Sequence, residues 1–348
     1  MLVDSPPEAS ADTAPAPPNR RRAIRSAGLL VSVCVLLLVV VASIAVGAKP
    51  MSLDQVWHGL FQDTGTYGDV VVAERLSRTL LGVLVGVALG LAGAVLQALT
   101  RNPLADPGLL GINLGASAAV VTAISFFGVT SLSGYVWFAF FGAAVVGAAV
   151  YALGGTRNAT PVRLALAGTA LSAALYGYLQ AVMIMDNAAL NKMRFWTVGS
   201  LASAKNETIL QVLPFLVIGI VLALGLARPL NAMAMGDDTA RALGAHLNRT
   251  RALSMAAATL LCGAATAACG PIMFVGLMVP HVVRSFTGPD MRWILPYAAI
   301  LSPVLLLGAD VIGRIVARPA ELQVGIITAL IGAPVFIFLV RRRRLAQL

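Results

Sequence analysis

Residues 79–98 read TLLGVLVGVALGLAGAVLQA, a run of twenty residues without one charged side chain. A helix needs about 20 apolar residues to cross the hydrocarbon core of a bilayer, so this run predicts a transmembrane helix. The whole chain has the same character: 58% of its 348 residues are hydrophobic, 11% are charged, and the mean hydropathy is +0.86. Soluble domains carry about 25% charged residues. A chain this apolar cannot keep a surface that faces water, so lipid must be its solvent.

Nine further apolar runs predict spans, and together the ten runs predict an all-α polytopic membrane protein of about ten transmembrane helices. The eighth run is short and contains Pro280, so we expect a broken or partly re-entrant helix, surrounded by protein or water. The predicted spans are residues 24–47, 79–98, 109–128, 133–153, 164–185, 207–227, 253–269, 271–284, 294–312 and 323–340.

The first 22 residues differ from the rest of the chain. They are rich in proline, alanine and serine and end in Arg20, Arg21 and Arg22, which predicts a disordered tail with a basic end. The apolar run that follows, Ile24 to Gly47, is longer than the 7–15 residues of a signal-peptide core. We therefore interpret it as a retained first span, and residues 23–344 as one transmembrane domain.

The basic residues indicate an orientation. With the N-terminus inside, 17 of the 25 lysines and arginines fall on inner segments and 8 on outer ones, a bias that favours two cytoplasmic termini. We therefore attribute the net charge of +10 to membrane topology and not to nucleic-acid binding. The eight outer basic residues run against the bias and are Lys49, Arg75, Arg78, Lys192, Arg194, Lys205, Arg314 and Arg318.

Several chemistries lack the residues they need. A P-loop requires a lysine after a glycine, and none of Lys49, Lys192 and Lys205 follows one, so any ATP-driven role needs a separate ATPase subunit. No H-E-x-x-H or C-x-x-C motif is present, so we expect no metal site and no enzyme activity in this chain. The three cysteines, at positions 34, 262 and 269, lie in apolar runs, where we expect small buried hydrophobic side chains.

A polar segment, residues 228–252, lies between the sixth and seventh predicted spans. Within it, Gly236 to Gly244 predicts one short helix, because Asp237 and Asp238 suit its positive N-terminal end and Gly244 suits its C′ position. Such a helix outside the membrane could dock against another protein, or it could be an ordinary capped loop helix. The spacing alone does not choose between these interpretations.

The fifth predicted span carries a polar stripe. Thr169, Ser172, Tyr176 and Gln180 follow one another at steps of three, four and four, so they share one helical face. A polar stripe in a membrane helix faces either a water-filled path or a neighbouring helix, and both interpretations stay open.

Acidic residues are scarce within the predicted spans. Asp310 is the clearest one, and Arg314 follows it by four residues, so a local ion pair is the simple expectation. Proton-coupled carriers use buried acids or histidines as relays, so this scarcity counts against that class.

Four segments of the chain match long motifs of one family, and their combination is highly specific. They are Arg101–Gly111 (RNPLADPGLLG), Phe195–Leu201 (FWTVGSL), Gly270–His281 (GPIMFVGLMVPH) followed by Arg284, and Glu321–Thr328 (ELQVGIIT) with Gly332–Pro334 (GAP). Together they resemble the FecCD family of bacterial ABC importer permeases, which move ferric siderophores, haem or cobalamin. The resemblance covers about residues 51–344.

The resemblance implies a multi-pass permease of the bacterial cytoplasmic membrane that works by alternating access. It implies a second permease subunit, identical or related, two cytoplasmic ATPase subunits that hold ATP and Mg, and an external substrate-binding protein. This chain would itself bind no cofactor. We expect a ferric siderophore as cargo, with haem or cobalamin as the alternative. A proton-driven carrier and an intramembrane enzyme are the rival classes.

The resemblance also implies roles for particular residues. The family's ATPase-coupling motif falls on Met235–Gly244, with Met235 in place of the usual leucine. Ser77 and Gln323 replace prolines of the family beside the outer arginines, which relaxes the backbone there. The implied coupling residues are Gly236, Asp237, Asp238, Ala240, Arg241, Leu243 and Gly244; the implied binding-protein contacts are Arg75, Arg78 and Arg314; the path follows Thr169, Ser172, Tyr176 and Gln180; and the inner gate is Asn102, Leu104, Pro161 and Val162.

Overall fold

The computed structural model describes residues 18–47, 51, 53–61, 67–129, 131–154, 161–202 and 205–342. Within these ranges every regular element is helical and none is a strand, which confirms the predicted all-α class. Residues 1–17 of the predicted tail lie outside the described part of the chain. Residues 18–22, which were placed in the same tail, are helical instead, because the first helix begins at Pro18 and includes the basic cluster.

Each of the ten predicted spans falls in a separate helix. Seven of the described helices are long and apolar enough to cross a membrane, and α4 and α14 are shorter apolar helices. The ten helices are α1 (Pro18–Ala45), α3 (Tyr67–Thr100), α4 (Ile112–Phe127), α5 (Leu132–Leu153), α6 (Pro161–Met185), α8 (Asn206–Gly225), α11 (Leu247–Cys269), α12 (Val275–Thr287), α13 (Met291–Val316) and α14 (Val324–Arg342).

Short helices connect or flank these spans. The predicted helix after Gly236 is present as α10. Helices α2, α7 and α9 are not among the predicted elements, because their eight to ten residues are too few for a span. Asp186 caps α7 by accepting a hydrogen bond from Ala188 N at 2.9 Å. The short elements are α2 (Leu53–Phe61), η1 (Pro107–Leu110), α7 (Asn187–Trp196), α9 (Ala227–Ala234) and α10 (Asp237–Ala242).

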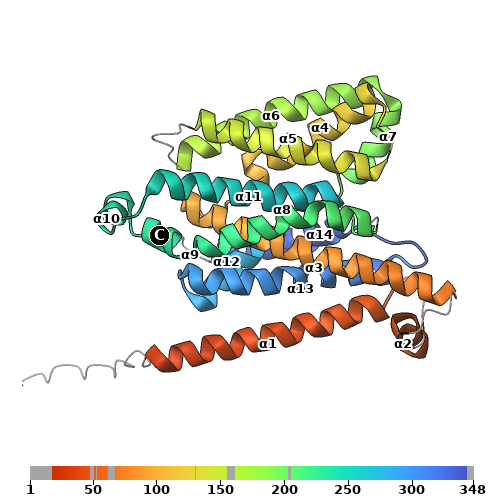
Figure 1. Ribbon diagram of the computed structural model, residues 1–348, viewed down its shortest axis with the longest axis horizontal. Helices are drawn as coiled ribbons and strands as arrows, with labels where there is room; N and C mark the ends of the chain where they lie inside the picture. The colour runs from red at the N-terminus through yellow and green to blue at the C-terminus, as the bar shows by residue number, and fades with distance from the viewer. Residues whose placement is uncertain are drawn as a thin grey trace, which may run out of the picture.

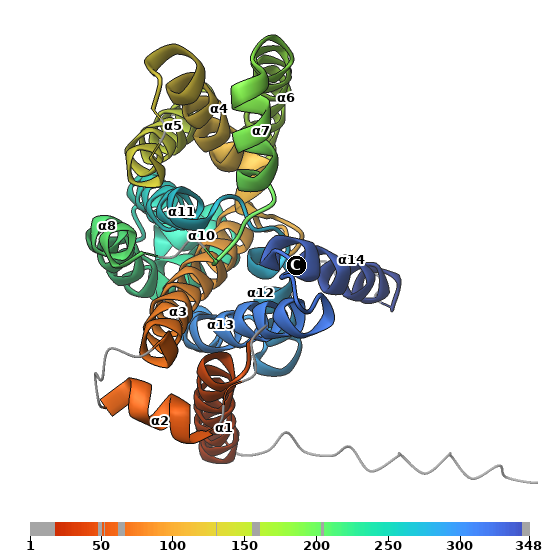
Figure 2. The same cartoon turned by 90° about the vertical axis from the view of Figure 1, so that its right-hand side faces the viewer.

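Helix α3 lies at the centre of the molecule, packed between α11 and α13, while α1 and α6 lie at the periphery (Figures 1 and 2). Four glycines, Gly82, Gly86, Gly90 and Gly93, allow this packing. A Cβ at Gly93 would stand 1.8 Å from the carbonyl oxygen of Gly276, and one at Gly86 would stand 2.5 Å from the backbone of Pro303. The helix backbones therefore touch directly, as small residues permit between membrane helices.

The expected irregularity of the eighth span is present, but it precedes the helix. Residues 270–274 are not helical, Phe274 has a φ of +69°, and α12 begins only at Val275. Pro280 lies inside the helix, so the break is not there. With 13 residues, α12 is about 20 Å long, against about 30 Å of bilayer core. Most of its side chains are buried among α3, α13 and α14, so protein surrounds the irregular backbone.

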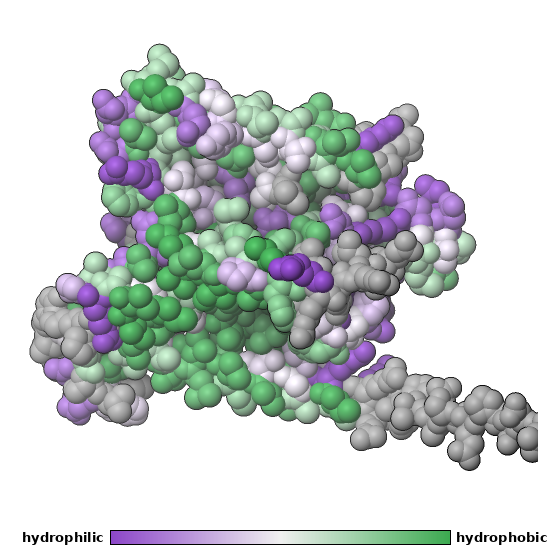
Figure 3. Space-filling view, turned by 180° about the vertical axis from the view of Figure 1, so that it is seen from behind, coloured by the Kyte–Doolittle hydropathy of each residue, from purple (hydrophilic) through white to green (hydrophobic). Residues whose placement is uncertain are grey.

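The start of α1 and the end of α14 lie at the end of the molecule that carries α10, here called the α10 end (Figure 1). Helices α2 and α7 lie at the opposite end, the α2 end. Hydrophobic residues cover most of the middle of the face in Figure 3, and hydrophilic residues gather towards the two ends. This distribution is typical of a protein whose middle is embedded in lipid.

Candidate functional site

The polar stripe of α6 divides between two cavities and the protein interior. Thr169 is exposed and lines a cavity of about 370 Å³, here called the Thr169 cavity, together with Asn102 and Val162. Ser172 faces Gly111 at the start of α4: a Cβ there would stand 3.0 Å from the Ser172 hydroxyl oxygen. The stripe thus serves both a cavity and helix packing, the two interpretations that the sequence left open.

Tyr176 and Gln180 line a larger cavity of about 740 Å³, here called the Tyr176 cavity. Leu104 from the loop after α3 and Phe274 from the loop before α12 also line it. Tyr176 is 55% exposed in this single chain, so the cavity opens beside α6 on the periphery of the molecule. Its wall combines aromatic and aliphatic carbon with a few amide and hydroxyl groups, a surface that suits a bulky polar molecule.

The residues expected at the inner gate do not all meet. Asn102 and Val162 line the Thr169 cavity, Leu104 lines the Tyr176 cavity, and Pro161 is the first residue of α6, with its side chain outside the described part. Asp106, which the sequence reasoning did not single out, lines both cavities.

Two local turns shape the loop that carries these residues. The side-chain oxygen of Asn102 accepts a hydrogen bond from Leu104 N at 2.9 Å, and that of Asp106 accepts one from Gly108 N at 2.7 Å. Such side-chain-to-backbone bonds stabilise tight turns where prolines prevent a helix. The motif Arg101–Gly111 therefore folds as a compact turn between the two cavities.

At the α10 end, Asp237 joins three elements. Its carboxylate accepts a hydrogen bond from Arg101 at the end of α3 and another from Arg251 of α11, the latter at 2.6 Å. Burial raises the pKa of Asp237, but the hydrogen bonds and charges of the two arginines outweigh it, so the pKa lies below its usual value. Arg101 also donates to Met233 O at 2.6 Å, which ties it to α9.

The predicted short helix is confirmed, and it has an inner and an outer face. Ala240 is completely buried, whereas Leu243 is 64% exposed and Met235 is 62% exposed. Asp238 and Arg241 form an exposed ion pair at 3.1 Å. Gly244, with a φ of +81°, ends the helix, since its left-handed backbone strains any other residue.

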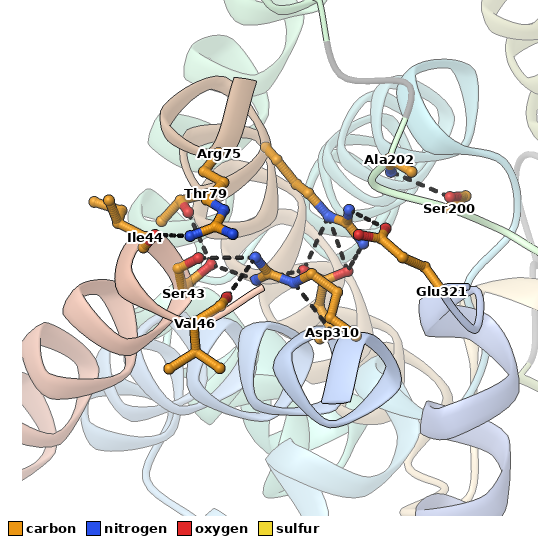
Figure 4. A network of polar contacts seen from close by, with 11 residues as sticks. Ser43, Ile44, Val46, Arg75, Thr79, Ser200, Ala202, Asp310 and Glu321 are labelled. Carbon is orange, nitrogen blue, oxygen red and sulfur yellow. Dashed lines mark hydrogen bonds and ion pairs between the residues drawn. The ribbon is translucent and has the colours of Figure 1, made fainter. Parts of the chain in front are cut away.

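At the α2 end, a second carboxylate is held by two arginines. Asp310 is completely buried and pairs with Arg78 at 2.7 Å and with Arg314 at 2.9 Å, and Arg78 also pairs with Glu321 at 2.6 Å (Figure 4). Arg314 is itself 1% exposed. The local Asp310–Arg314 pair that the spacing predicts is therefore confirmed.

Arg314 of this cluster and two neighbouring arginines, Arg75 and Arg318, also cap the end of α1. The last carbonyl groups of a helix have no partner within it and carry a partial negative charge, which cations stabilise. Figure 4 shows the end of α1 against these guanidinium groups. Arg75 donates to Ile44 O and Ala45 O at 3.1 and 3.0 Å, Arg314 to Ser43 O and Val46 O at 2.8 and 3.0 Å, and Arg318 to Gly47 O at 2.8 Å.

The expectation that Arg314 contacts a binding protein is wrong in this structure. Its guanidinium is buried and bonded to Asp310 and α1, so a partner's glutamate cannot reach it. Arg75 is 7% exposed and Arg78 is held by two carboxylates, but both lie nearer the surface of the α2 end, and their contact with a partner stays a prediction.

The structure also bears on metal ligands, on the three cysteines and on the partners of the charged site residues. Among the described residues no group of three histidine, cysteine, aspartate or glutamate side chains could hold a metal ion. Cys262 and Cys269 are buried as expected, but Cys34 is exposed on α1, because that helix packs along only one side of the bundle. Arg251 and Glu321, which pair with charged site residues, were not predicted from the sequence. The position of Glu321 at the start of a quoted motif is the one sequence feature that points to it.

Comparison with known proteins gives a consistent family. The FecCD transport family matches residues 35–342. The chain is 46% identical to the ferric enterobactin transport system permease protein of Escherichia coli, over 92% of this chain and 96% of that protein. It is 38% identical to an Fe(3+)-citrate import system permease protein of Bacillus subtilis, over 94% and 98% of the two chains.

A solved structure has the same fold. A metal-chelate type ABC transporter in an inward-facing conformation superimposes with a TM-score of 0.81 at 28% identity, covering 92% of this chain and all of that one. The spans and the cavities beside α6 agree with a membrane subunit that conducts a solute. The chain belongs to the FecCD transport family and is a membrane-embedded permease subunit of an ABC importer.

Proposed function

We propose that this chain is the permease of an ATP-driven importer for ferric siderophores. The relatives are named for ferric enterobactin and Fe(3+)-citrate, and a hemin permease of Yersinia pestis, 36% identical, represents the alternative cargo class. The Tyr176 cavity supports a bulky polar cargo, because its wall offers an aromatic ring, an amide and few charges. The chain itself binds no cofactor in this proposal; ATP and Mg belong to the partner subunits.

The single observation that carries the mechanism is the connection from α10 to the cavities. Asp237 at the start of α10 is bonded to Arg101, and Arg101 begins the compact turn whose Asn102 and Leu104 line the two cavities. A push on α10 therefore reaches the cavity walls through one ion pair and three residues of backbone. This is the route by which closure of two ATPase subunits would switch the path between its outward-open and inward-open states.

The exposed face of α10 is the proposed ATPase contact. Leu243 and Met235 present apolar carbon to the solvent next to the Asp238–Arg241 pair. Buried apolar contacts with a polar rim are the usual composition of a protein interface. In this proposal the α10 end, with the start of α1 and the end of α14, faces the cytoplasm, as the charge bias of the sequence also favours.

The open side of α6 supports a second permease subunit, identical or related. Thr169 and Tyr176 are exposed in the single chain, although polar groups in a membrane helix need a protein or water neighbour. A second subunit against this side would close the path. At the α2 end, Arg75 and Arg78 are the proposed contacts of an external binding protein.

Uptake measurements test the proposal. A strain that lacks this chain receives the wild-type permease with its partner subunits, and uptake of ferric siderophores, haem and cobalamin is compared with and without ATP. We expect ATP-dependent uptake of a ferric siderophore. Uptake by this chain alone without ATP would indicate a secondary carrier, and uptake of only haem or cobalamin would replace the proposed cargo.

A second experiment tests the coupling contact. Leu243→Gln is compared with Met185→Gln, because Met185 is also an exposed apolar side chain, 88% exposed at the end of α6. We expect Leu243→Gln to lower transport-coupled ATPase activity several-fold and Met185→Gln to leave it unchanged. Equal activities in both variants would contradict the assignment of α10.

A further inference from the structure

A third cavity, apart from the two beside α6, lies at the α10 end. It has a volume of about 530 Å³ and is enclosed by α1, α3, α9, α12 and α13. Most of its wall is apolar, yet three arginines from three different helices line it. We call it the Arg284 cavity; its polar and charged lining residues are Arg25, Gln97, Arg101, Asn231, Arg284, Thr287 and Asp290.

Arg284 lacks a compensating charge. Its Nε is enclosed without a hydrogen-bond partner, and within the described part of the chain no ion pair or hydrogen bond to its guanidinium is found. The one acid in the wall, Asp290, accepts hydrogen bonds from Asn231 at 2.6 Å and from Arg292 at 2.9 Å. A guanidinium partly withdrawn from water without a counter-charge is destabilised, so this position favours a bound anion.

The balance of charge around the cavity is positive. The described wall carries three arginines, Arg25, Arg101 and Arg284, and one carboxylate, Asp290. Asp290 pairs with Arg292 outside the wall, and Arg101 pairs with Asp237, which Arg251 shares. Both carboxylates are already paired, so neither neutralises Arg25 or Arg284. Guanidinium groups bind phosphate oxygens through two parallel hydrogen bonds, which makes phosphate the anion best matched to this set.

Aromatic side chains beside the cavity mark the level of a membrane interface. The guanidinium of Arg25 lies 5.9 Å from the ring centre of Trp293, and Tyr297 donates a hydrogen bond to Arg25 O at 2.6 Å. Phe286 packs edge-on against Tyr297 with ring centres 5.3 Å apart and is 53% exposed. Tryptophan and tyrosine gather where lipid head groups meet water.

We propose that the Arg284 cavity binds a phosphate ester, with Arg284 and Arg25 holding the phosphate oxygens. The apolar wall and the aromatic residues favour the head group of an anionic phospholipid as its source, and a soluble phosphate is the other source of the same chemistry. Basic pockets between membrane helices bind phospholipid head groups in this manner. The site is distinct from the path, because it shares no lining residue with the Thr169 and Tyr176 cavities.

The test measures binding to the full-length protein. Wild type, Arg284→Gln, Arg25→Gln and the control Arg249→Gln are purified in detergent, and native mass spectrometry measures their affinity for phosphatidylglycerol and phosphatidylcholine. Arg249 is an exposed arginine of α11 at the same end that does not line the cavity. We expect wild type and the control to bind phosphatidylglycerol selectively, and each cavity variant to bind it about ten-fold more weakly.

A stability measurement accompanies the binding assay in case Arg284→Gln folds poorly. Phosphatidylglycerol should raise the melting temperature of wild type and of Arg249→Gln, and it should raise that of Arg25→Gln much less. If inorganic phosphate at millimolar concentration displaces the lipid and alone raises the melting temperature equally, the site binds phosphate from solution. Equal lipid binding by all four proteins overturns the proposal. It is also overturned if lipid binds only after deletion of residues 1–17, because the chain's own acidic tail would then be the occupant.

Discussion

The two ends of the molecule each contain an aspartate paired with arginines, but the two aspartates differ in their exposure to water. At each end one aspartate is held by two arginines from different helices, but Asp310 at the α2 end is completely buried, while the side chain of Asp237 at the α10 end is 32% exposed. The buried cluster contacts the end of α1 through Arg314 and holds that helix in place. The half-exposed cluster lies under α10, whose other face is open.

This difference in burial separates a fixed contact from an adjustable one. Breaking a buried ion pair leaves an uncompensated charge away from water, whereas water can solvate the partners of an exposed pair. The cluster at Asp310 is therefore suited to hold α1 in every state of the permease. At Asp237 the pair with Arg101 is suited to rearrange, because water reaches both side chains, whereas Arg251 is buried and is expected to stay paired with Asp237.

The largest expected effect is that of Asp310→Ala, which leaves Arg314 buried without a counter-charge. We expect a loss of about 3–5 kcal/mol in the free energy of unfolding, the range found for removing one partner of a buried pair. Thermal unfolding in detergent measures it. Glu321→Gln is the control, since Glu321 is 34% exposed and pairs with the same Arg78. An equal loss in both variants would contradict the distinction by burial.

A smaller effect is expected from Arg75→Gln, which removes two hydrogen bonds to the end of α1. We expect a loss of about 2 kcal/mol in local stability, because bonds from charged donors contribute about 1.5–3 kcal/mol. Hydrogen exchange should become faster in the last turn of α1 and stay unchanged in α6. Ser77→Ala, which removes the exposed bonds from its hydroxyl to Asn206 and to Ala73 O, should change neither helix.

At the other end, Asp237→Asn should cost about 2 kcal/mol, between the values for an exposed and a fully buried pair, because water reaches Asp237 and Arg101 but Arg251 is buried. The lowered pKa fixes the pH dependence: the stabilisation is complete above the unfolded value of about 3.9 and is lost as the pH falls through the folded value. The stability difference between wild type and variant should therefore be constant from pH 8 to about pH 5, decrease below about pH 4 and vanish only below the folded pKa of Asp237. Chemical denaturation across this range measures it. A difference that disappears near neutral pH would contradict the pairing.

The smallest expected change in stability is that of the double variant Asp238→Asn, Arg241→Gln. An exposed pair three residues apart on a helix contributes about 0.3–0.5 kcal/mol, so the melting temperature should hardly move. Transport-coupled ATPase activity and uptake should nevertheless fall several-fold, because both side chains lie on the proposed ATPase contact. If both activities survive intact, the coupling role of α10 is wrong.

The number and class of the helices could be predicted from the sequence because lipid demands long apolar runs. Their ends were less predictable. Helix α3 begins at Tyr67, twelve residues before the predicted span, since Glu74, Arg75 and Arg78 interrupt the apolar run but not the helix. Hydropathy indicates which residues lie in lipid, but a helix continues as long as its backbone hydrogen bonds continue, so it can extend beyond the apolar run.

The candidate site was predictable where its residues share one helix. The stripe from Thr169 to Gln180 and the pair of Asp310 with Arg314 follow from helical spacing. The bonds from Arg314 to Ser43 and Val46 do not, because they join positions about 270 residues apart. The pair of Asp237 with Arg101 does not follow from spacing either, because 136 residues separate the two positions. Sequence periodicity carries no information on which distant helix ends meet.

The glycines of α3 limit where residues can be inserted into this helix or deleted from it. Inserting one residue after Gly82 would rotate the rest of the helix by about 100°. Gly86, Gly90 and Gly93 would then leave their contacts together, and larger side chains would meet the backbones of α12 and α13. We therefore expect insertions and deletions to be absent from this stretch among functional variants. In an insertion-scanning library selected for uptake, α3 should be the longest segment in which no insertion is recovered.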